Sequence, residues 1–338
     1  MVRFAFVTRL SDDLLCEIMS WVGSEGYYHI SQACKEWHRL SPHVLRDIRK
    51  ISYWRRGKLS KLVIPPDLVN LREIKCRYNR LKELTLPPTL VNLREIHCCY
   101  NRLTKFVIPP TLINLREIWC NGNNLRELTL PDTLVNLKYI QFNDNVLRKF
   151  ILPPSLVNLK RIECVRNKLR SISIPPTLVN LTDIEIYENE ITELTIPDTL
   201  INLKKLWCNS NNLMTLTLPD TLVKLEWFWC SHNKLRELII PPTLVKLKTI
   251  SCNNNKLEAL ALPTTLINLY SLDCSNNNLR TLSLSPTLVN LTRLYCTHNR
   301  LKELILFPTL INLKQLYYRR NILESLVIPL ELRVMTDE

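Results

Sequence analysis

The sequence has little glycine and histidine and no long hydrophobic run. Only 4 of the 338 residues are glycine, which excludes a glycine-rich loop that could cradle a phosphate group. The 6 histidines are scattered, and none has a cysteine or serine at a spacing that indicates an activated nucleophile. No apolar run reaches the roughly 18 residues of a membrane helix. We therefore expect no catalytic residues, no cofactor and no membrane segment.

The N-terminus also lacks the features of an export signal. The apolar part of MVRFAFVTRLSDD is too short for a secretory signal peptide. The 12 cysteines are then expected to remain thiols in a reducing compartment. We expect the protein in the cytoplasm, which would be the host cytoplasm if the source is a virus, or in the nucleus.

One 22-residue repeat dominates the sequence. The unit reads LxxIxCxxNxLxxLxLPPTLVN, and full copies follow one another without an insertion from about residue 59 to 323, with a partial copy ending near Leu332. The IxC segment, such as Ile74 to Cys76, predicts a short strand that points alternate side chains into the core. The prolines predict an extended return. Stacked turns of this kind bury a continuous core through nearest-neighbour contacts.

An asparagine follows each predicted strand, where the chain turns. Asn79 is the first, and the same position holds asparagine in every full copy. A buried amide there can bond the backbone groups of adjacent turns. This position therefore predicts an internal row of hydrogen bonds along the stack.

Most of the cysteines occupy a single slot of the repeat. Phe142, Ile186 and Tyr318 fill the same slot in other copies, which indicates a hydrophobic position. A single file at 22-residue intervals cannot supply the converging ligands that zinc needs. We therefore expect buried thiols and no metal site. Because strand side chains alternate, we expect Cys98 in the core and its neighbour Cys99 exposed on the sheet. We also expect His97 and His232 to be exposed. The buried file contains Cys76, Cys98, Cys120, Cys164, Cys208, Cys230, Cys252, Cys274 and Cys296.

These repeats resemble the leucine-rich repeat family, over about four-fifths of the chain. The LPPTLVNL return is most similar to the short repeats of bacterial effectors of the IpaH and YopM type. The resemblance implies an α/β leucine-rich-repeat solenoid with a parallel β-sheet on its concave face and extended, polyproline-like convex returns. The expected domains are a helical module at 1–50, a linker or N-terminal cap at 51–58, the solenoid at 59–332 and an acidic tail at 333–338.

The outward positions of the strands carry many aromatic residues. Such side chains are costly to leave bare and are typical of binding hot spots. The alternative is that they pack on one another as a cross-strand ladder. We predict a target-protein surface on the concave face, formed by Trp119, Tyr187, Trp207, Trp227, Trp229, Tyr295 and Tyr317.

The first fifty residues have helical periodicity instead. Ser11 is a favourable N-cap for a helix with Leu14, Leu15 and Ile18 on one face. Gly23 to Gly26 interrupts this helix. A second face carries Ile30, Cys34 and Trp37, and Ser41–Pro42 begins a third helix.

This segment resembles an F-box, which attaches substrate receptors to cullin-RING ubiquitin ligases. The run CKEWHRL, residues 34–40, is the most specific part of the match. The order of an F-box and then repeats is similar to the F-box/leucine-rich-repeat substrate receptors, including those of giant DNA viruses. The resemblance implies a Skp-type adaptor as partner, contacted by Leu10, Leu14, Leu15, Ile18, Ile30, Cys34 and Trp37.

The formal net charge of +14 raises a nucleic-acid alternative. Basic residues recur at one repeat position, as in Arg72, Arg94 and Arg116, each beside a glutamate that we expect to pair with it. The central concave column contains one lysine and three acids, so we do not expect nucleic acid in it.

The sequence thus predicts a non-catalytic substrate receptor for a cullin-RING ligase. Two alternatives remain open at this stage. In the first, the F-box-like helices only cap a free-standing binding scaffold. In the second, the basic edge binds a polyanion weakly.

Overall fold

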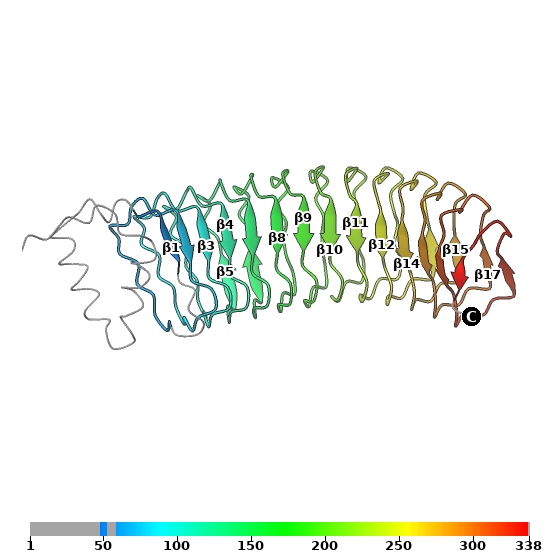
Figure 1. Ribbon diagram of the computed structural model, residues 1–338, viewed down its shortest axis with the longest axis horizontal. Helices are drawn as coiled ribbons and strands as arrows, with labels where there is room; N and C mark the ends of the chain where they lie inside the picture. Colours follow the sequence, from blue (N-terminus) through cyan, green and yellow to red (C-terminus); the bar gives the residue numbers. More distant parts are fainter. Residues whose placement is uncertain (1–47, 53–58, 337–338) are drawn as a thin grey trace, which may run out of the picture. The chain divides into compact units, whose positions relative to one another are not determined.

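The computed structural model describes residues 48–52 and 59–336 and comprises two compact units, Met1–Leu156 and Val157–Glu338. In Figure 1 both units consist of short, parallel strands joined by extended connections. The described residues contain no helix, and thus none that could cross a membrane. The predicted F-box contacts Leu10, Leu14, Leu15, Ile18, Ile30, Cys34 and Trp37 lie outside the described residues.

The first unit contains one main parallel sheet and one small second ladder. The order in the main sheet is β1-β2-β3-β4-β6, and β5 pairs with β7 on the opposite side of the coil. Its strands are β1 (Lys50–Ser52), β2 (Glu73–Lys75), β3 (Glu95–His97), β4 (Glu117–Trp119), β5 (Glu127–Thr129), β6 (Tyr139–Gln141) and β7 (Lys149–Ile151).

The second unit repeats this plan. The order in its main sheet is β8-β9-β10-β11-β12-β14-β16-β18-β20, and the pairs β13–β15 and β17–β19 form short second ladders. Its strands are β8 (Arg161–Glu163), β9 (Asp183–Glu185), β10 (Lys205–Trp207), β11 (Trp227–Trp229), β12 (Thr249–Ser251), β13 (Ala259–Ala261), β14 (Ser271–Asp273), β15 (Thr281–Ser283), β16 (Arg293–Tyr295), β17 (Glu303–Ile305), β18 (Gln315–Tyr317), β19 (Ser325–Val327) and β20 (Met335–Thr336).

The 22-residue period fixes the strand register. Ile74 pairs with Ile96, and Leu206 pairs with Phe228, so each apolar strand residue lies directly beside its counterpart on the next turn. These side chains are fully buried, and burial of a leucine or isoleucine contributes about 1.5–3 kcal/mol. The predicted parallel solenoid is confirmed within each unit, and its core is a row of equivalent side chains.

The asparagine row links successive turns, as predicted. Asn101 shows the pattern: its Nδ2 donates to the carbonyl oxygens of Cys76 and Cys98 at 2.9 and 3.0 Å, and its Oδ1 accepts from Leu81 N at 3.0 Å. One amide thus bonds backbone groups of two adjacent turns. These groups lie at the bend, where the sheet hydrogen bonds end. The bend itself needs a positive φ just before the asparagine, which 11 non-glycine residues adopt at this position.

Gly122 is the exception at that bend, and its neighbour explains it. Tyr100 stacks on Tyr78 with ring centroids 4.7 Å apart. A Cβ on Gly122 would lie 2.6 Å from Cδ1 of Tyr100. The missing side chain therefore makes room for the tyrosine ring.

The returning side of the described turns has no helix, in agreement with the proline-rich sequence, and polar side chains hold it in place. Thr111 Oγ1 donates to the carbonyl of Pro88 at 2.5 Å, and Asn114 Nδ2 donates to that of Val91 at 2.9 Å. Between these contacts, a β-branched residue faces solvent in most turns, such as Val91 and Ile113.

The ends of the described repeats extend slightly beyond the predicted solenoid. β1 pairs in parallel with β2, and Ile48 and Ile51 are buried. At the other end, Met335 and Thr336 pair with Gln315 and Leu316 of β18. The sheet therefore includes residues that the sequence analysis placed at the end of the N-terminal module, in the linker and in the acidic tail.

Candidate functional site

The candidate site is the face of the main sheet whose side chains point away from the core, called the sheet face here. It is the surface that the sequence predicts as concave. The last residues of adjacent strands form the predicted central column. In the first unit the column is Lys75, His97, Trp119 and Gln141. In the second unit it is Glu163, Glu185, Trp207, Trp229, Ser251, Asp273, Tyr295 and Tyr317.

Three of the predicted target-binding residues form one cluster in the second unit. The rings of Trp207 and Trp229 are stacked with centroids 4.4 Å apart and planes 6° apart. The ring of Tyr187 meets Trp207 edge-on at 6.1 Å. We call these three residues the tryptophan cluster. The sequence analysis predicted exposed rings for binding and gave a cross-strand ladder as the alternative. The rings are half-buried, because they pack on one another in such a ladder.

Lysine residues complete this cluster. Lys205 Nζ lies 4.2 Å from the ring centroid of Trp207. Trp227 belongs to the neighbouring column, where Lys248 Nζ lies 5.3 Å from its ring. The indole Nε1 of Trp229 donates to Thr249 Oγ1 at 3.2 Å, whereas the buried Nε1 of Trp207 has no hydrogen-bond acceptor in the part of the chain that the structure describes. The cluster thus presents both apolar area and an unused donor.

The other predicted aromatic residues lie elsewhere on the sheet face. Tyr295 and Tyr317 are stacked at 5.0 Å, and Tyr295 OH donates to Gln315 Oε1 at 2.8 Å. Trp119 belongs to the first unit. The seven predicted residues therefore form separate groups and not one continuous patch.

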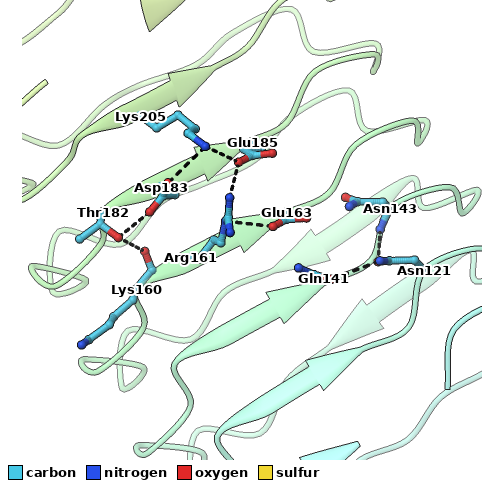
Figure 2. A network of polar contacts seen from close by, with 10 residues as sticks. All are labelled: Asn121, Gln141, Asn143, Lys160, Arg161, Glu163, Thr182, Asp183, Glu185 and Lys205. Atoms are coloured by element: carbon cyan, nitrogen blue, oxygen red, sulfur yellow. Dashed lines mark hydrogen bonds and ion pairs between the residues drawn. The ribbon is translucent and has the colours of Figure 1, made fainter. Parts of the chain in front are cut away.

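An ion network lies beside the tryptophan cluster on β8, β9 and β10 (Figure 2). Arg161 contacts Glu163 and Glu185, both at 2.9 Å. Lys205 Nζ lies 3.2 Å from Glu185 Oε1 and 3.6 Å from Asp183 Oδ1. The two glutamates of the central column are buried but compensated by positive charge.

Figure 2 also shows an amide chain in the first unit. Asn121 Nδ2 donates to Gln141 Oε1 at 3.2 Å, and Asn121 Oδ1 accepts from Asn143 N at 3.0 Å. These bonds fix the end of the central column in that unit.

His97 is buried, which corrects the expectation of an exposed histidine. Its ring is stacked on Trp119 with centroids 4.3 Å apart, and Arg77 lies over the same indole at 4.7 Å. Arg77 Nη2 is 3.0 Å from His97 Nδ1. Burial, together with the charges of Arg77 and Lys75, lowers the pKa of His97 to about 4. His97 and Trp119 occupy the same column one repeat apart, so this contact could have been predicted from the sequence.

The same region contains three side chains with the composition of a metal site. One ligand atom each from Glu95, His97 and Glu117 lies within 4.8 Å of the others. Arg77 can only donate, so we assign the proton of the neutral imidazole to Nε2, the nitrogen that faces the carboxylates. Lys75 Nζ also lies 3.3 Å from Glu95 Oε2. A protonated nitrogen and a neutralised carboxylate do not suit a cation, so the group is better described as an internally compensated ion cluster.

The contacts of the glutamates also correct a predicted pairing. Glu73 and Glu95 both contact Lys75 on the sheet face, at 2.8 and 3.3 Å. The sequence analysis expected them to pair with the arginines at positions 72 and 94. Because successive strand residues point to opposite sides, the lysine two residues after Glu73 is nearer than the adjacent arginine.

The cysteine file is buried, as predicted. All ten described cysteines are free thiols, and burial raises the pKa of Cys208 to about 12. Cys99 corrects the expectation of an exposed thiol, because it is only 4% exposed. Its short side chain lies between longer ones at the same position of adjacent turns, Arg77 and Asn121. Burial raises its pKa to about 11. Cys99 therefore lacks the features of a reactive thiol.

Comparison with known proteins identifies the repeats. The matching family model is the BspA-type leucine-rich repeat region, at residues 46–168, 94–207, 163–253 and 203–324. No curated protein sequence matches the chain significantly.

Three of the similar solved structures come from the bacterial genera Yersinia and Listeria. YopM from Yersinia enterocolitica is 28% identical, with a TM-score of 0.60, covering 85% of this chain and 63% of that one. YopM from Yersinia pestis, a leucine-rich effector protein, is 26% identical with a TM-score of 0.62, covering 86% and 83%. The functional domain of InlJ from Listeria monocytogenes, which includes a cysteine ladder, is 22% identical with a TM-score of 0.73, covering 88% and 66%.

The chain spans just under two thirds of the InlJ chain and of the Yersinia enterocolitica YopM chain. The InlJ match shows a shared fold, and the YopM matches agree with the resemblance of the repeats to YopM-type effectors. Because the family model covers most of the sequence, the chain belongs to the BspA-type leucine-rich repeat family.

Proposed function

We propose that the protein is a non-catalytic receptor that holds a partner protein on its sheet face. The observation that supports this most strongly is the tryptophan cluster. Large rings supply much apolar contact area at low cost in conformational entropy and are enriched in binding hot spots. The rings are already stacked before binding, so little further ordering is required.

Neighbouring groups give this surface directional contacts. Among the described residues, Trp207 Nε1 and Asn209 Oδ1 are buried and have no hydrogen-bond partner. A partner that displaced the side chains covering them would satisfy one donor and one acceptor. The similar YopM of Yersinia pestis, which is an effector protein, is consistent with a binding role for repeats of this type.

We further propose that the N-terminal segment attaches the protein to a Skp-type adaptor of a cullin-RING ubiquitin ligase. The support is the F-box resemblance of the sequence, in particular residues 34–40. In this role the receptor would raise the effective concentration of target lysines near a charged E2 enzyme. Such a complex would operate in the cytoplasm or the nucleus.

Adaptor binding can be measured with purified proteins. The full chain is expected to retain a Skp adaptor in a pull-down, and Leu14→Ala/Trp37→Ala is expected to abolish retention. Trp207→Ala is the matched control, because it changes the sheet face and should leave adaptor binding intact. Retention that survives the Leu14/Trp37 double substitution, or no retention at all, would contradict the ligase proposal while leaving the binding role of the sheet face in place.

A second candidate is a free-standing scaffold whose N-terminal segment only caps the repeats. The pairing of β1 with β2 and the burial of Ile48 and Ile51 favour it, because the residues that directly follow this segment are already packed as part of the repeat stack. This alternative predicts that deletion of residues 1–48 destabilises the repeats and that no Skp adaptor binds. Thermal unfolding of the deletion variant, beside the pull-down, distinguishes the two.

A further inference from the structure

Asp273 has an unusual position on the sheet face of the second unit. It lies on β14 between Ser251 of β12 and Tyr295 of β16. Its Oδ1 accepts a hydrogen bond from Ser275 N at 3.0 Å. Its side chain is half-buried, and this burial raises the pKa of the carboxyl group.

An aromatic residue lies on each side of this carboxylate along the column, Tyr295 on the adjacent strand and Trp229 two strands away. Trp207 covers one face of the Trp229 ring, and the column continues beyond the other face with the short side chain of Ser251. Tyr317 likewise covers one face of Tyr295, and the residue beyond its other face is Asp273. Trp229 and Tyr295 are three strand intervals apart, or about 14 Å. Two short residues, one of them acidic, therefore lie between two ring faces.

Asp273 also differs from the other two acids of the central column, because those acids form ion pairs with nearby basic side chains. Glu163 contacts Arg161, and Glu185 contacts both Arg161 and Lys205. Within residues 48–52 and 59–336, Asp273 forms no ion pair. Arg293 on the adjacent strand lies instead over the ring of Tyr270, at 5.3 Å. A protonated His232 would favour ionisation of Asp273 through its field. A partly desolvated carboxylate without a cation is a costly arrangement that a cationic ligand would relieve.

We propose that Asp273, flanked by Trp229 and Tyr295, binds one arginine or lysine side chain of the protein held on the sheet face. A guanidinium or ammonium group there would form a charge-assisted hydrogen bond to the carboxylate. The ring of Tyr295, on the adjacent strand, would add cation–π attraction. This inference rests on the proposed function and specifies the partner chemistry.

The charge of the whole chain limits the partner further. The formal net charge is +14, which repels a long basic tract. At physiological salt, charges more than about 8 Å apart are largely screened, so a single basic side chain at Asp273 experiences mainly its immediate surroundings. The partner segment is therefore one basic residue among apolar or aromatic residues that contact the tryptophan cluster.

A displayed library of random peptides, each about 12 residues long, tests this without a known partner. Peptides enriched on the full chain are expected to share one arginine or lysine. Replacing that residue by glutamine should weaken binding about tenfold, as one charge-assisted contact is lost. Asp273→Asn should weaken binding by a similar factor, and the combined change should cost no more than either alone. Asp220→Asn is the matched control, because Asp220 is exposed away from the sheet face.

The contrary results separate this inference from the proposed function. Enriched peptides that lose affinity with Trp207→Ala but not with Asp273→Asn would overturn the basic-residue site and leave the sheet face as the binding surface. Peptides that bind equally to Trp207→Ala and Asp273→Asn would overturn both. Circular dichroism of each variant checks that the strands remain folded.

Discussion

The indole rings of Trp207 and Trp229 lie 4.4 Å apart and nearly parallel, on residues that are register partners of adjacent strands. The separation is close to the spacing of two hydrogen-bonded strands. A 22-residue repeat therefore brings identical rings into stacking distance whenever consecutive copies hold tryptophan in the central column. This contact can be measured by spectroscopy and by stability.

Removing either ring should abolish the stack. Trp207→Ala or Trp229→Ala should eliminate the coupled indole signal in the near-ultraviolet circular dichroism and destabilise the protein. A double-mutant cycle should give a coupling of about 0.5–1.5 kcal/mol. Trp227→Ala is the control, because Trp227 contacts Lys248 and not the stacked pair. A coupling near zero would show that the rings do not interact in solution.

The asparagine row should contribute strongly to stability. Asn255 Nδ2 donates to the carbonyls of Cys230 and Cys252, both at 3.0 Å, and Oδ1 accepts from Leu235 N at 3.0 Å. Asn255→Ala removes these three bonds and leaves the buried Leu235 N–H unsatisfied, whereas Asn233 and Asn277 still donate to the Cys230 and Cys252 carbonyls. We expect a cost of about 1–3 kcal/mol in urea unfolding. Asn268→Ala removes one exposed bond to Val245 and should cost less than about 1 kcal/mol. Equal costs would contradict a structural role for the buried amide.

The buried histidine makes stability depend on pH. The pKa of His97 is lowered to about 4 in the fold, against about 6.5 in an unfolded chain. Between these values the unfolded state binds more protons, so stability is complete above pH 6.5 and decreases as the pH falls toward 4. We expect a loss of about 1–2 kcal/mol across this range relative to His97→Gln.

The histidine can be followed directly by NMR titration. His97 should remain neutral at pH 5.5, and its resonance should titrate near pH 4. His232→Gln serves as the exposed control and should retain the wild-type loss of stability. An ordinary midpoint near pH 6.5 for His97 would contradict its burial between Arg77 and Trp119.

The thiols should be inert while the protein is folded. Burial raises the pKa of Cys99 to about 11 and that of Cys208 to about 12, so few thiolates exist at pH 8. Iodoacetamide labelling followed by peptide mass spectrometry should modify Cys99 less than a tenth as fast as in guanidinium chloride. Fast labelling of native Cys99 would restore the exposed position that the sequence predicted.

Substitution of a glutamate should lower the free energy of unfolding more in the buried ion network than in an exposed ion pair. Glu185 is bonded by Arg161 and Lys205, at 2.9 and 3.2 Å, with only 8% of its side chain exposed. Glu185→Gln leaves two cations near each other and should cost about 1–3 kcal/mol in chemical unfolding. Glu188→Gln breaks a contact to Arg166 in which both partners are well exposed, so its cost should be below about 1 kcal/mol. A smaller cost for Glu185→Gln than for Glu188→Gln would contradict the network.

The sequence by itself determined the structure of one repeat and how it stacks on the next. The 22-residue spacing specifies the register, the cysteine slot and the asparagine row, because each depends only on which residue recurs beside its copy. The same reasoning placed Trp207, Trp229 and Asp273 on the sheet face. Each of these properties follows from alternation along a short strand and from repetition of one unit.

Only the tertiary structure decided how side chains of neighbouring columns arrange themselves. Cys99 and His97 were expected to be exposed, and both are buried because Arg77, Asn121 and Trp119 extend over them from adjacent turns. The periodic pattern gives the direction of each side chain from its own backbone. The length and orientation of its neighbours decide how much water reaches it, and these vary from copy to copy. The compensated Glu185 and the uncompensated Asp273 hold the same repeat position and differ for this reason.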